Sequence, residues 1–430
     1  MSESLPTPTQ PKISHRLAVR TLFLILVLGA VYFSYTWWKD KSQDLTDLKP
    51  ATTRGWLAAV EYQQDGQQVV TFSPDGKVVA SPGWKPGMTD RDLTWNPSGN
   101  RLFFVSDRED NNFNIFRWNP TDGSDPVRKT TGSRSRGEPQ FNRESAEDSD
   151  KSALITSGGF VLEYTPKDMS TRQVLPPLGR DIVQSSDEEG GGSTGQFSGA
   201  YEKFGNSFKI ARWCKQKTWI AAVMRRDQGE VLILQNLAPN AEGKLPRPLP
   251  VAAGEHVDFD VNPKDGTIVF VVQGFQWPDE TQIPAEFRKG NKVTRPFAHL
   301  VGHIDPDAKA NEGPLAASKD DEISFGSPSI SPDGASVVLV AGKYENGSLS
   351  PKALAAAPIQ QGGMNLAARL AIGEVYEPVW SPDGETIAFA ERQKSGKRAI
   401  VTIHKDGSGR TVLGGDTGNF GNPSFSPQLK

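Results

Sequence analysis

The sequence predicts an all-β protein made of repeated units, and three observations support this prediction. The turn phrase Ser-Pro-Asp-Gly occurs at residues 331–334 and 381–384, and a shortened Ser426-Pro427 continues the series. The copies begin 50 and then 45 residues apart, which is about the length of one four-stranded blade of a β-propeller. The chain also has 42 Gly and 32 Pro in 430 residues, which indicates many turns, and it shows no long helical pattern.

The turn phrase has a direct physical reading. Proline fixes φ at the first corner of a tight turn, whereas Asp and Gly suit positions that need a side-chain hydrogen bond or a positive φ. Each copy follows a short strand pattern that starts at a proline, as at residues 378–380. Apolar runs at residues 337–340 and 387–390 follow the turns and are rich in strand-forming residues. Each copy therefore predicts a β-hairpin.

Weaker copies of the pattern extend the series toward the N-terminus. They lie at residues 93–99, 139–142 and 259–266. A further strand start is expected near residues 208–212, although no proline marks it. Seven strand starts predict a seven-bladed β-propeller, with six blades as the alternative.

The copy at residues 73–76 belongs to a different strand, because a whole blade does not fit between it and the pattern at residues 93–99. Residues 57–76 align instead with residues 387–407, and both segments end in Asp-Gly. The N-terminal segment thus supplies strands two to four of a blade. Residues 423–427 supply a first strand with nothing after it, so we expect the two ends to form one blade and close the ring.

These repeats resemble the TolB-type β-propeller repeat, the Pro-Asp-Gly variant of the WD repeat. The resemblance covers residues 56–430 and is strongest after Gly326, and the segments at residues 106–108 and 405–410 also fit its pattern. It implies the fold but no single function, because the same blades serve the periplasmic TolB protein, the propeller parts of prolyl-oligopeptidase-type enzymes and free-standing binding proteins. The small α/β domain that TolB carries ahead of its propeller has no counterpart in the pattern, so a TolB-like role in envelope maintenance is not implied.

A run of 18 residues, 21–38, carries no charge and ends in two tryptophans. It can span a bilayer as a helix, since about 18–20 residues at 1.5 Å each are needed. A cleaved signal peptide is the alternative, but no small-x-small site follows the run, and paired tryptophans suit a membrane interface. Lys12, Arg16 and Arg20 precede the run, which favours a cytoplasmic N-terminus and an exported propeller.

The predicted organisation is that of a single-pass protein of the cytoplasmic (inner) membrane. Residues 1–20 form a cytoplasmic tail, residues 21–38 the transmembrane anchor, and residues 39–55 a juxtamembrane linker. Residues 56–430 form the TolB-like propeller, which is expected in the periplasm or outside the cell.

Composition argues against a nucleic-acid-binding function and against an internal disulfide. The net charge is −3 and no basic stripe is present, so the chain has nothing with which to neutralise nucleic-acid phosphates. The single cysteine, Cys214, rules out an internal disulfide and is expected to be a buried thiol. No cofactor is expected.

Two insertions interrupt the repeats. The first, residues 184–199, is acidic and then rich in Gly and Ser. It matches the letters of a dinucleotide-binding fingerprint and of a nucleophile elbow, but it lacks the strand and helix that either motif needs. We expect a flexible loop.

The second insertion, residues 274–321, interleaves aromatic and basic residues, which is a composition typical of recognition surfaces. The alternative is that the aromatic side chains hold the loop against the ring. His299 and His303 have the spacing of metal ligands on a helix, but Pro296 and Gly302 weaken that helix and no third ligand is evident, so no metal site is expected. The candidate partner-binding residues are Phe275, Trp277, Phe287, Arg288, Arg295, Phe297 and His299.

No catalytic residues are predicted. The chain has five histidines, and none forms a motif with carboxylates at a spacing that chemistry requires. Asp107 is expected to stabilise a turn by pairing with Arg108. A hydrolase or lyase site assembled at the ring axis from several blades leaves no local motif, so that possibility stays open.

The sequence therefore predicts a membrane-anchored, extracytoplasmic β-propeller that acts as a non-catalytic protein-interaction scaffold. The alternatives are a receptor for envelope polysaccharide or a small ligand, and an enzyme with its site at the axis. An axial site requires polar and charged residues that converge on the axis. A scaffold is expected to present apolar and Arg side chains on residues 274–321.

Overall fold

The computed structural model describes most of the chain after residue 54. The described residues are 55–74, 76–131, 135–142, 152–178, 199–290, 292–308, 314–359, 369–415 and 418–427. The predicted tail, anchor and most of the linker, together with nearly all of the insertion at residues 184–199, lie outside this set. In the part of the chain that is described, no helix has the length and apolar character needed to cross a membrane.

The described residues form antiparallel sheets, and the predicted all-β class is confirmed. Five of these sheets have four strands each. They comprise β29 (Phe420–Phe425), β1 (Leu57–Gln63), β2 (Gly66–Phe72) and β3 (Val78–Ala80); β4 (Asp90–Trp95), β5 (Leu102–Ser106), β6 (Asn114–Trp118) and β7 (Val127–Arg128); β8 (Arg136–Phe141), β9 (Ala153–Ser157), β10 (Phe160–Thr165) and β11 (Ser170–Leu175); β21 (Ser324–Ile330), β22 (Ser336–Glu345), β23 (Ser348–Pro358) and β24 (Arg369–Ile372); and β25 (Val375–Trp380), β26 (Thr386–Arg392), β27 (Arg398–His404) and β28 (Thr411–Leu413).

A sixth sheet has seven strands, because the 13-residue strand β15 belongs to two units at once. Its first half pairs with β14, as in Glu230 opposite Gly254, and its second half pairs with β16, as in Val257 opposite Val272. The sheet thus consists of two four-stranded parts that share β15. Its strands are β12 (Ser207–Cys214), β13 (Trp219–Arg226), β14 (Gly229–Asn236), β15 (Leu249–Val261), β16 (Ile268–Gln276), β19 (His299–Ile304) and β20 (Ala316–Ser318).

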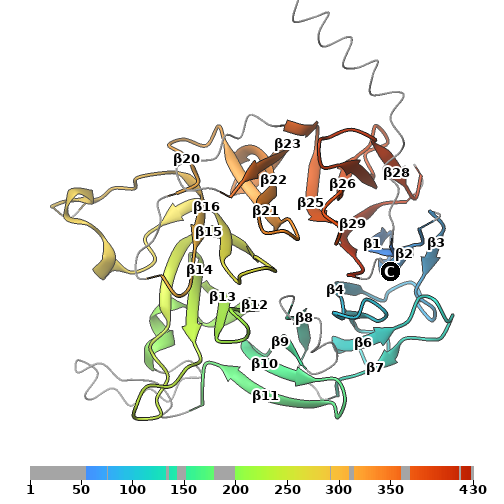
Figure 1. Ribbon diagram of the computed structural model, residues 1–430, viewed down its shortest axis with the longest axis horizontal. Coiled ribbons are helices and arrows are strands. Elements are labelled where there is room, and N and C mark those ends of the chain that lie inside the picture. The colour runs from blue at the N-terminus through green and yellow to red at the C-terminus, as the bar shows by residue number, and fades with distance from the viewer. Residues whose placement is uncertain are drawn as a thin grey trace, which may run out of the picture. The chain divides into compact units, whose positions relative to one another are not determined.

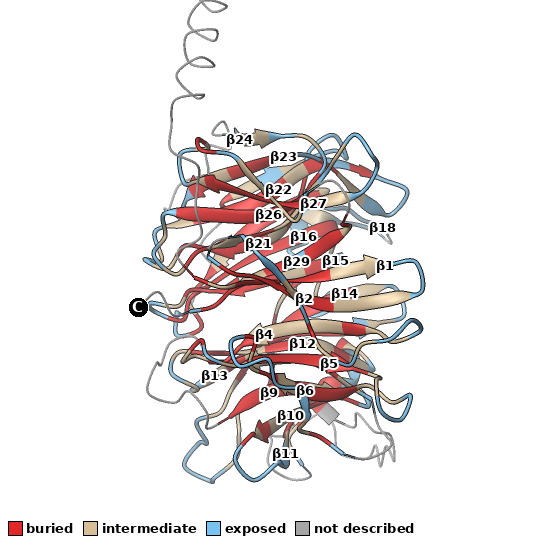
Figure 2. Cartoon of the chain, turned by 90° about the vertical axis from the view of Figure 1, so that its right-hand side faces the viewer, coloured by how far each residue is buried: buried red, intermediate tan, exposed pale blue. Residues whose placement is uncertain are grey.

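The first strands of these units stand around a common centre and form a ring (Figure 1). Contacts between β4 and β8, β8 and β12, β12 and β15, β15 and β21, β21 and β25, β25 and β29, and β29 and β4 close the circle. The predicted strand start near residues 208–212 is confirmed by β12. Figure 2 shows that the strands are largely buried along their length, while the connecting loops carry the exposed residues.

The first and last described strands, β1 and β29, pair with each other and close the ring, as predicted. Strand β29 pairs with β1, with Ser424 opposite Ala58. Trp95 Nε1 of the next unit donates a hydrogen bond to the Ser424 carbonyl oxygen at 3.0 Å, and Ser426 Oγ donates to the Gly99 carbonyl oxygen at 2.7 Å. The last described strand is therefore fixed to both of its neighbours.

The turn phrase folds as its chemistry predicts. In the copy at residues 331–334, Gly334 has φ 71° and its N–H donates to the Ser331 carbonyl oxygen at 2.8 Å. Ser331 Oγ donates to Asp333 Oδ1 at 2.6 Å, and the same carboxylate accepts the Ala335 N–H at 3.0 Å. These bonds satisfy the turn backbone and direct β22 back along β21.

The boundaries predicted for the second insertion are wrong. Strands β19 and β20 lie within residues 274–321 and belong to the seven-stranded sheet, where Leu300 and Val301 are buried. The part that projects from the ring is shorter, residues 277–298, and we call it the projecting loop. It contains the 3-10 turns η3 (Glu280–Gln282) and η4 (Ala285–Phe287) and the short strands β17 (Arg288–Lys289) and β18 (Lys292–Val293).

Candidate functional site: an axial channel and a surface groove

The innermost strands repeat a local distortion where they begin. A residue with positive φ interrupts the pairing of the strand with its neighbour, so that a β-bulge is formed. Because a bulge re-aims a side chain, each of these strands presents a polar residue toward the centre of the ring. The residues are Asp92 (φ 51°), Glu138 (φ 47°), Ser327 (φ 48°), Glu377 (φ 54°) and Asn422 (φ 51°).

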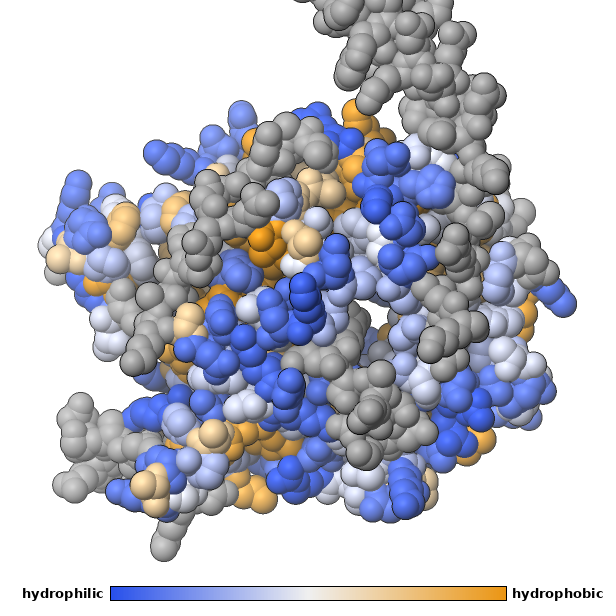
Figure 3. All heavy atoms as spheres, in the orientation of Figure 1, coloured by the Kyte–Doolittle hydropathy of each residue, from blue (hydrophilic) through white to orange (hydrophobic). Residues whose placement is uncertain are grey.

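These polar residues line a channel at the ring axis. It has a cavity of about 260 Å³ that joins a second one of about 480 Å³ through shared residues. Figure 3 shows hydrophilic residues around the opening at the centre of this face. Charged residues come from five different inner strands, and they comprise Asp92, Glu138, Asp258, Asp260 and Glu377 together with Lys209 and Arg212.

Burial changes the protonation of the axial carboxyl groups. Burial, together with the neighbouring Asp92 carboxylate, raises the pKa of Glu138 to about 8. Burial also raises the pKa values of Asp92, Asp258 and Glu377. The fifth axial carboxylate, that of Asp260, has its charge balanced by Arg212, which donates a hydrogen bond to it. Carboxyl groups with raised pKa values and few cations nearby are typical of functional sites, although structural networks produce them too.

The opposite mouth of the channel has a different character. It opens into a cavity of about 320 Å³ lined by aromatic and proline side chains from the turn-phrase ends of the inner strands. Here Trp380 Nε1 donates to the Ser329 carbonyl oxygen at 3.1 Å, which ties two neighbouring units together. Trp380 at this mouth thus also links neighbouring units of the ring.

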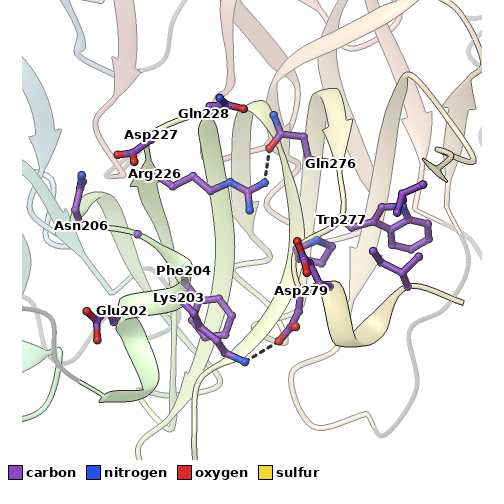
Figure 4. Close-up of a pocket in the computed structure, with 15 residues that line it drawn as sticks. Glu202, Lys203, Phe204, Asn206, Arg226, Asp227, Gln228, Gln276, Trp277 and Asp279 are labelled. Carbon is purple, nitrogen blue, oxygen red and sulfur yellow. Dashed lines mark hydrogen bonds and ion pairs between the residues drawn. The ribbon is translucent and has the colours of Figure 1, made fainter. Parts of the chain in front are cut away.

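A larger hollow lies on the surface, between the 3-10 segment η2 (Gly199–Phe204) and the projecting loop (Figure 4). We call it the groove. Its volume is about 1130 Å³. The hairpin between β13 and β14 forms its third side, and the lining residues include Glu202, Lys203, Phe204, Arg226, Asp227, Gln228, Gln276, Trp277, Asp279, Glu280, Ile283 and Val293.

An ion pair joins the two walls of the groove. Lys203 Nζ of η2 lies 2.7 Å from Asp279 Oδ2 of the projecting loop. Asp279 also accepts the Thr281 N–H at 2.9 Å and so caps η3. The hydrogen bond from Lys203 holds the pKa of Asp279 down at about 2. The carboxylate thus positions the projecting loop against the ring.

Arg226 stands at the centre of the groove and has a neutral partner. It donates a hydrogen bond to Gln276 Oε1, and among the described residues it forms no ion pair. In Figure 4 the carboxylate of Asp227 points away from the Arg226 guanidinium. Burial lowers the pKa of Arg226.

The predicted partner-binding aromatic residues pack on one another. The ring centroids of Phe275 and Trp277 lie 5.4 Å apart, those of Phe275 and Phe297 5.7 Å, and those of Trp277 and Phe287 5.4 Å. Phe275 is buried, whereas the other three are half-buried. Trp277 alone among these four lines the groove.

The predicted basic residues lie apart from this cluster. Arg288 donates hydrogen bonds to the carbonyl oxygens of Ile283, at 3.3 Å, and of Glu280, and it thereby braces the projecting loop from within. Arg295 is exposed. Neither residue lines the groove.

His299 is a buried residue of strand β19, with 0% of its surface exposed. Its Nδ1 accepts the Gly274 N–H at 3.2 Å, so Nε2 carries the proton and donates to Asp321 Oδ1 at 3.1 Å. Burial lowers the pKa of His299. The spacing of His299 and His303 would suit metal ligands only on a helix, and both residues lie on strand β19, where four residues span roughly 13 Å.

The predicted pairing of Asp107 with Arg108 is also different in the structure. Asp107 Oδ1 accepts the Thr89 N–H at 2.7 Å, which stabilises the turn. Arg108 instead reaches across to Asp90, with Nη2 and Oδ2 2.8 Å apart and side-chain exposures of 7% and 0%. The partner was missed because it lies 18 residues away on β4. In the described ranges, no three His, Cys, Asp or Glu side chains come together as metal ligands.

Comparison with known proteins supports the fold and leaves the family open. No family model and no curated protein matches the sequence. Among solved structures, a puromycin hydrolase matches with a TM-score of 0.52 at 11% identity, over 86% of this chain and 54% of that one. TolB of Acinetobacter baumannii matches with a TM-score of 0.48 at 14% identity, over 88% and 68% of the two chains. A Cps50 (Swd1) β-propeller domain of Myceliophteria thermophila matches at 0.47 and 10% identity, over 79% and 90%.

These similarities concern the fold alone, and this chain spans about half the length of the hydrolase. The ring of first strands and its closure by β29 and β1 identify a β-propeller. The proteins of this shape differ in activity, so the function has to be argued from the channel and the groove.

Proposed function

We propose that this protein is a non-catalytic interaction protein that holds a segment of a protein partner in the groove. The observation that carries the proposal is the groove itself, about 1130 Å³ in volume and walled on one side by the projecting loop. Sites for small molecules usually measure about 300–1000 Å³. The groove exceeds that range, as expected for a site that receives a stretch of polypeptide.

The lining of the groove suits protein recognition. It combines a tryptophan, an arginine and exposed amide side chains, and Trp and Arg are the residues that most often carry binding energy at interfaces. Trp277 Nε1 donates to the Thr294 carbonyl oxygen at 3.1 Å, and its ring rests on Phe275 and Phe287. A tryptophan fixed in this way loses little conformational entropy on binding.

In this proposal six of the seven predicted partner-binding residues divide into two groups. Trp277 contacts the partner, whereas Phe275, Phe287, Phe297, Arg288 and His299 hold the projecting loop in place. The seventh, Arg295, is exposed outside the groove and belongs to neither group. We further propose that the ring has seven blades, that residues 21–38 anchor it in the cytoplasmic membrane, and that the propeller faces the periplasm or the exterior. These statements rest on the sequence pattern.

The proposal is tested by photo-cross-linking in cells. A photoreactive amino acid at Gln228, which is exposed on the groove, is expected to give a discrete adduct in the full-length protein. The same amino acid at Asp122, an exposed turn residue between β6 and β7, serves as control and is expected to give none. Replacing residues 280–294 by a short Gly-Ser linker should abolish the Gln228 adduct. Equal adducts at both positions, or an adduct that survives the loop replacement, would contradict the proposal.

A second candidate function belongs to the channel. Five carboxyl groups line it against two cations, Lys209 and Arg212, so it suits a small ligand with ammonium or hydroxyl groups. Glu138, protonated near neutral pH because its pKa is about 8, is the group that a reaction at the axis would use as a general acid. Calorimetric titration with putrescine, and with 1,4-butanediol as the uncharged control, tests this candidate. Absence of heat with both compounds would remove it.

A further inference from the structure

Arg226 is the arginine that lines the groove, and among the described residues it forms no ion pair. It ends strand β13 at the floor of the groove and is half-buried, and its hydrogen-bond partner is the neutral amide of Gln276. Arg108 and Arg212 each pair with a carboxylate, Asp90 and Asp260 respectively. Other half-buried arginines resemble Arg226 in having no ion pair with a described residue but do not line the groove, namely Arg101, Arg117 and Arg398. A guanidinium that has lost part of its hydration without gaining a counter-charge is costly unless a ligand supplies the charge.

The remaining donors of Arg226 face the groove. A guanidinium carries five N–H donors, and one terminal nitrogen is used by Gln276. Figure 4 shows the other terminal nitrogen pointing away from Gln276 into the space between η2 and the projecting loop. Because the fork of a guanidinium matches two oxygens at once, the free side of Arg226 suits a carboxylate.

We propose that Arg226 is the specificity-determining residue of the groove and binds the carboxylate of an Asp or Glu side chain in the partner segment. The inference rests on the proposed function, since it names the chemistry that the same groove selects. Gln276 holds the guanidinium in place, and Trp277 supplies the adjoining apolar wall.

The rim of the groove limits what can flank that carboxylate. Glu202, Asp227 and Glu280 are exposed there, and Asp279 is already neutralised by Lys203. A run of acidic residues would be repelled by these three carboxylates, whereas neutral or basic residues would be tolerated or attracted. The expected partner segment therefore carries a single acidic residue between neutral or basic neighbours.

The test uses a display library of random dodecapeptides selected on the immobilised full-length protein, and compares it with the Arg226→Gln variant. Peptides that need the groove, because the loop replacement abolishes their binding, are expected to share one Asp or Glu at a fixed position. Changing that residue to its amide in a synthetic peptide should weaken binding by roughly ten- to a hundredfold. In Arg226→Gln the acid and amide peptides should bind equally.

Two further variants separate recognition from folding. Arg225→Gln alters the exposed neighbour of Arg226 and is expected to keep the acid preference unchanged. Arg226→Lys retains the charge but lacks the fork, and is expected to keep part of the preference. Preference for the acid that persists in Arg226→Gln would overturn the inference.

The outcomes also distinguish this inference from the proposed function. Groove-dependent peptides without an acidic consensus would leave the proposed function standing and overturn the role of Arg226. Selection that yields no groove-dependent peptide would overturn both. A third outcome is that no peptide consensus emerges, while the protein binds polygalacturonate and loses this binding in Arg226→Gln. This would indicate an acidic polysaccharide as the ligand and contradict the protein partner proposed here.

Discussion

The axial channel and the groove are built in opposite ways. The channel arises where the repeats agree, because the bulged residues Asp92, Glu138, Ser327, Glu377 and Asn422 occupy equivalent places on their strands. The groove arises where the repeats are interrupted, between η2 and the projecting loop. The channel collects carboxyl groups whose burial is not matched by cations, whereas the groove centres on one cation without a carboxylate partner.

The difference separates the residues that keep the ring folded from those that are available to bind a partner. The bulged inner strands each pair with the second strand of their own unit and carry the bulge at the equivalent place, so the bulged residues share one geometry around the ring. Loop-built positions can vary without disturbing the strands. We therefore place the ring's stability in the strands and channel and its specificity in the groove, and four predictions test that division.

The largest effect is expected from removing the closing strand. Deleting residues 421–430 takes away most of β29, its ladder with β1 and the buried Phe425. Loss of one buried aromatic side chain alone costs roughly 3–5 kcal/mol, so we expect the deletion to abolish cooperative thermal unfolding in circular dichroism. Deleting residues 184–199 is the control and should leave the transition in place. Equal effects of the two deletions would contradict closure of the ring by its ends.

The next effect concerns a buried ion pair inside the ring. Arg108→Ala leaves Asp90, with 0% of its side chain exposed, without its cation, and breaking such a pair costs about 3–5 kcal/mol. The change should lower the thermal midpoint but leave groove binding unaltered at temperatures where the variant is folded. The matched control is Arg172→Ala, which removes an ion pair to Glu163 whose arginine is 75% exposed and should cost less than about 1 kcal/mol. Similar losses of stability in the two variants would show that the buried ion pair stabilises the ring no more than the exposed one does.

Glu138→Gln should change how stability depends on pH. The pKa of Glu138 is raised in the folded chain to about 8, from an ordinary value of 4.5, so the folded state binds a proton that the unfolded state releases. Stability should therefore fall as pH rises between about 4.5 and 8. Glutamine removes this contribution. The thermal unfolding midpoint of the variant should therefore change less with pH across that window, and it should be higher than that of the unchanged protein at pH 8. The control Glu286→Gln alters an exposed carboxylate, and a flattening of the same size there would exclude the axial explanation.

The smallest effect is expected at the ion pair between the groove walls. Lys203→Met removes the hydrogen bond that lowers the pKa of Asp279 to about 2, and the pKa should rise toward its ordinary value in a carbon-detected NMR titration. The stabilisation from this pair is present above the ordinary carboxyl pKa and is lost as pH falls toward 2. Because Lys203 is 51% exposed, the loss at neutral pH should stay below about 1 kcal/mol. Lys343→Met, at a distant exposed pair with Glu345, should leave the Asp279 titration unchanged.

Much of the ring could be predicted from the sequence, because each repeat carries its own turn chemistry. The turns at residues 331–334 and 381–384 and the pairing of β29 with β1 follow from that local pattern. The long strand β15 could not be predicted, since it continues from one four-stranded part into the next with a single glycine, Gly254, and no turn phrase between them. Nor could the true extent of the projecting loop, because β19 carries two histidines and no turn phrase.

The two candidate sites were harder to predict for a physical reason. The channel brings together residues from separate strands, and no stretch of sequence contains more than two of its charged members. A signal did exist, because Glu138, Glu377 and Asn422 each stand directly before a proline at a strand start. No sequence signal marks Arg226. Its neighbour Arg225 has the same charge, and only the fold shows which of the two faces the groove.

The division between groove and channel is tested most directly by hydrogen–deuterium exchange of the full-length protein with and without a groove-selected peptide. We predict slower exchange in residues 199–206, 226–230 and 276–290 when the peptide is bound, and unchanged exchange at the inner strand starts, residues 90–94, 136–140 and 255–260. Protection confined to those strand starts would contradict the account and place binding at the axis.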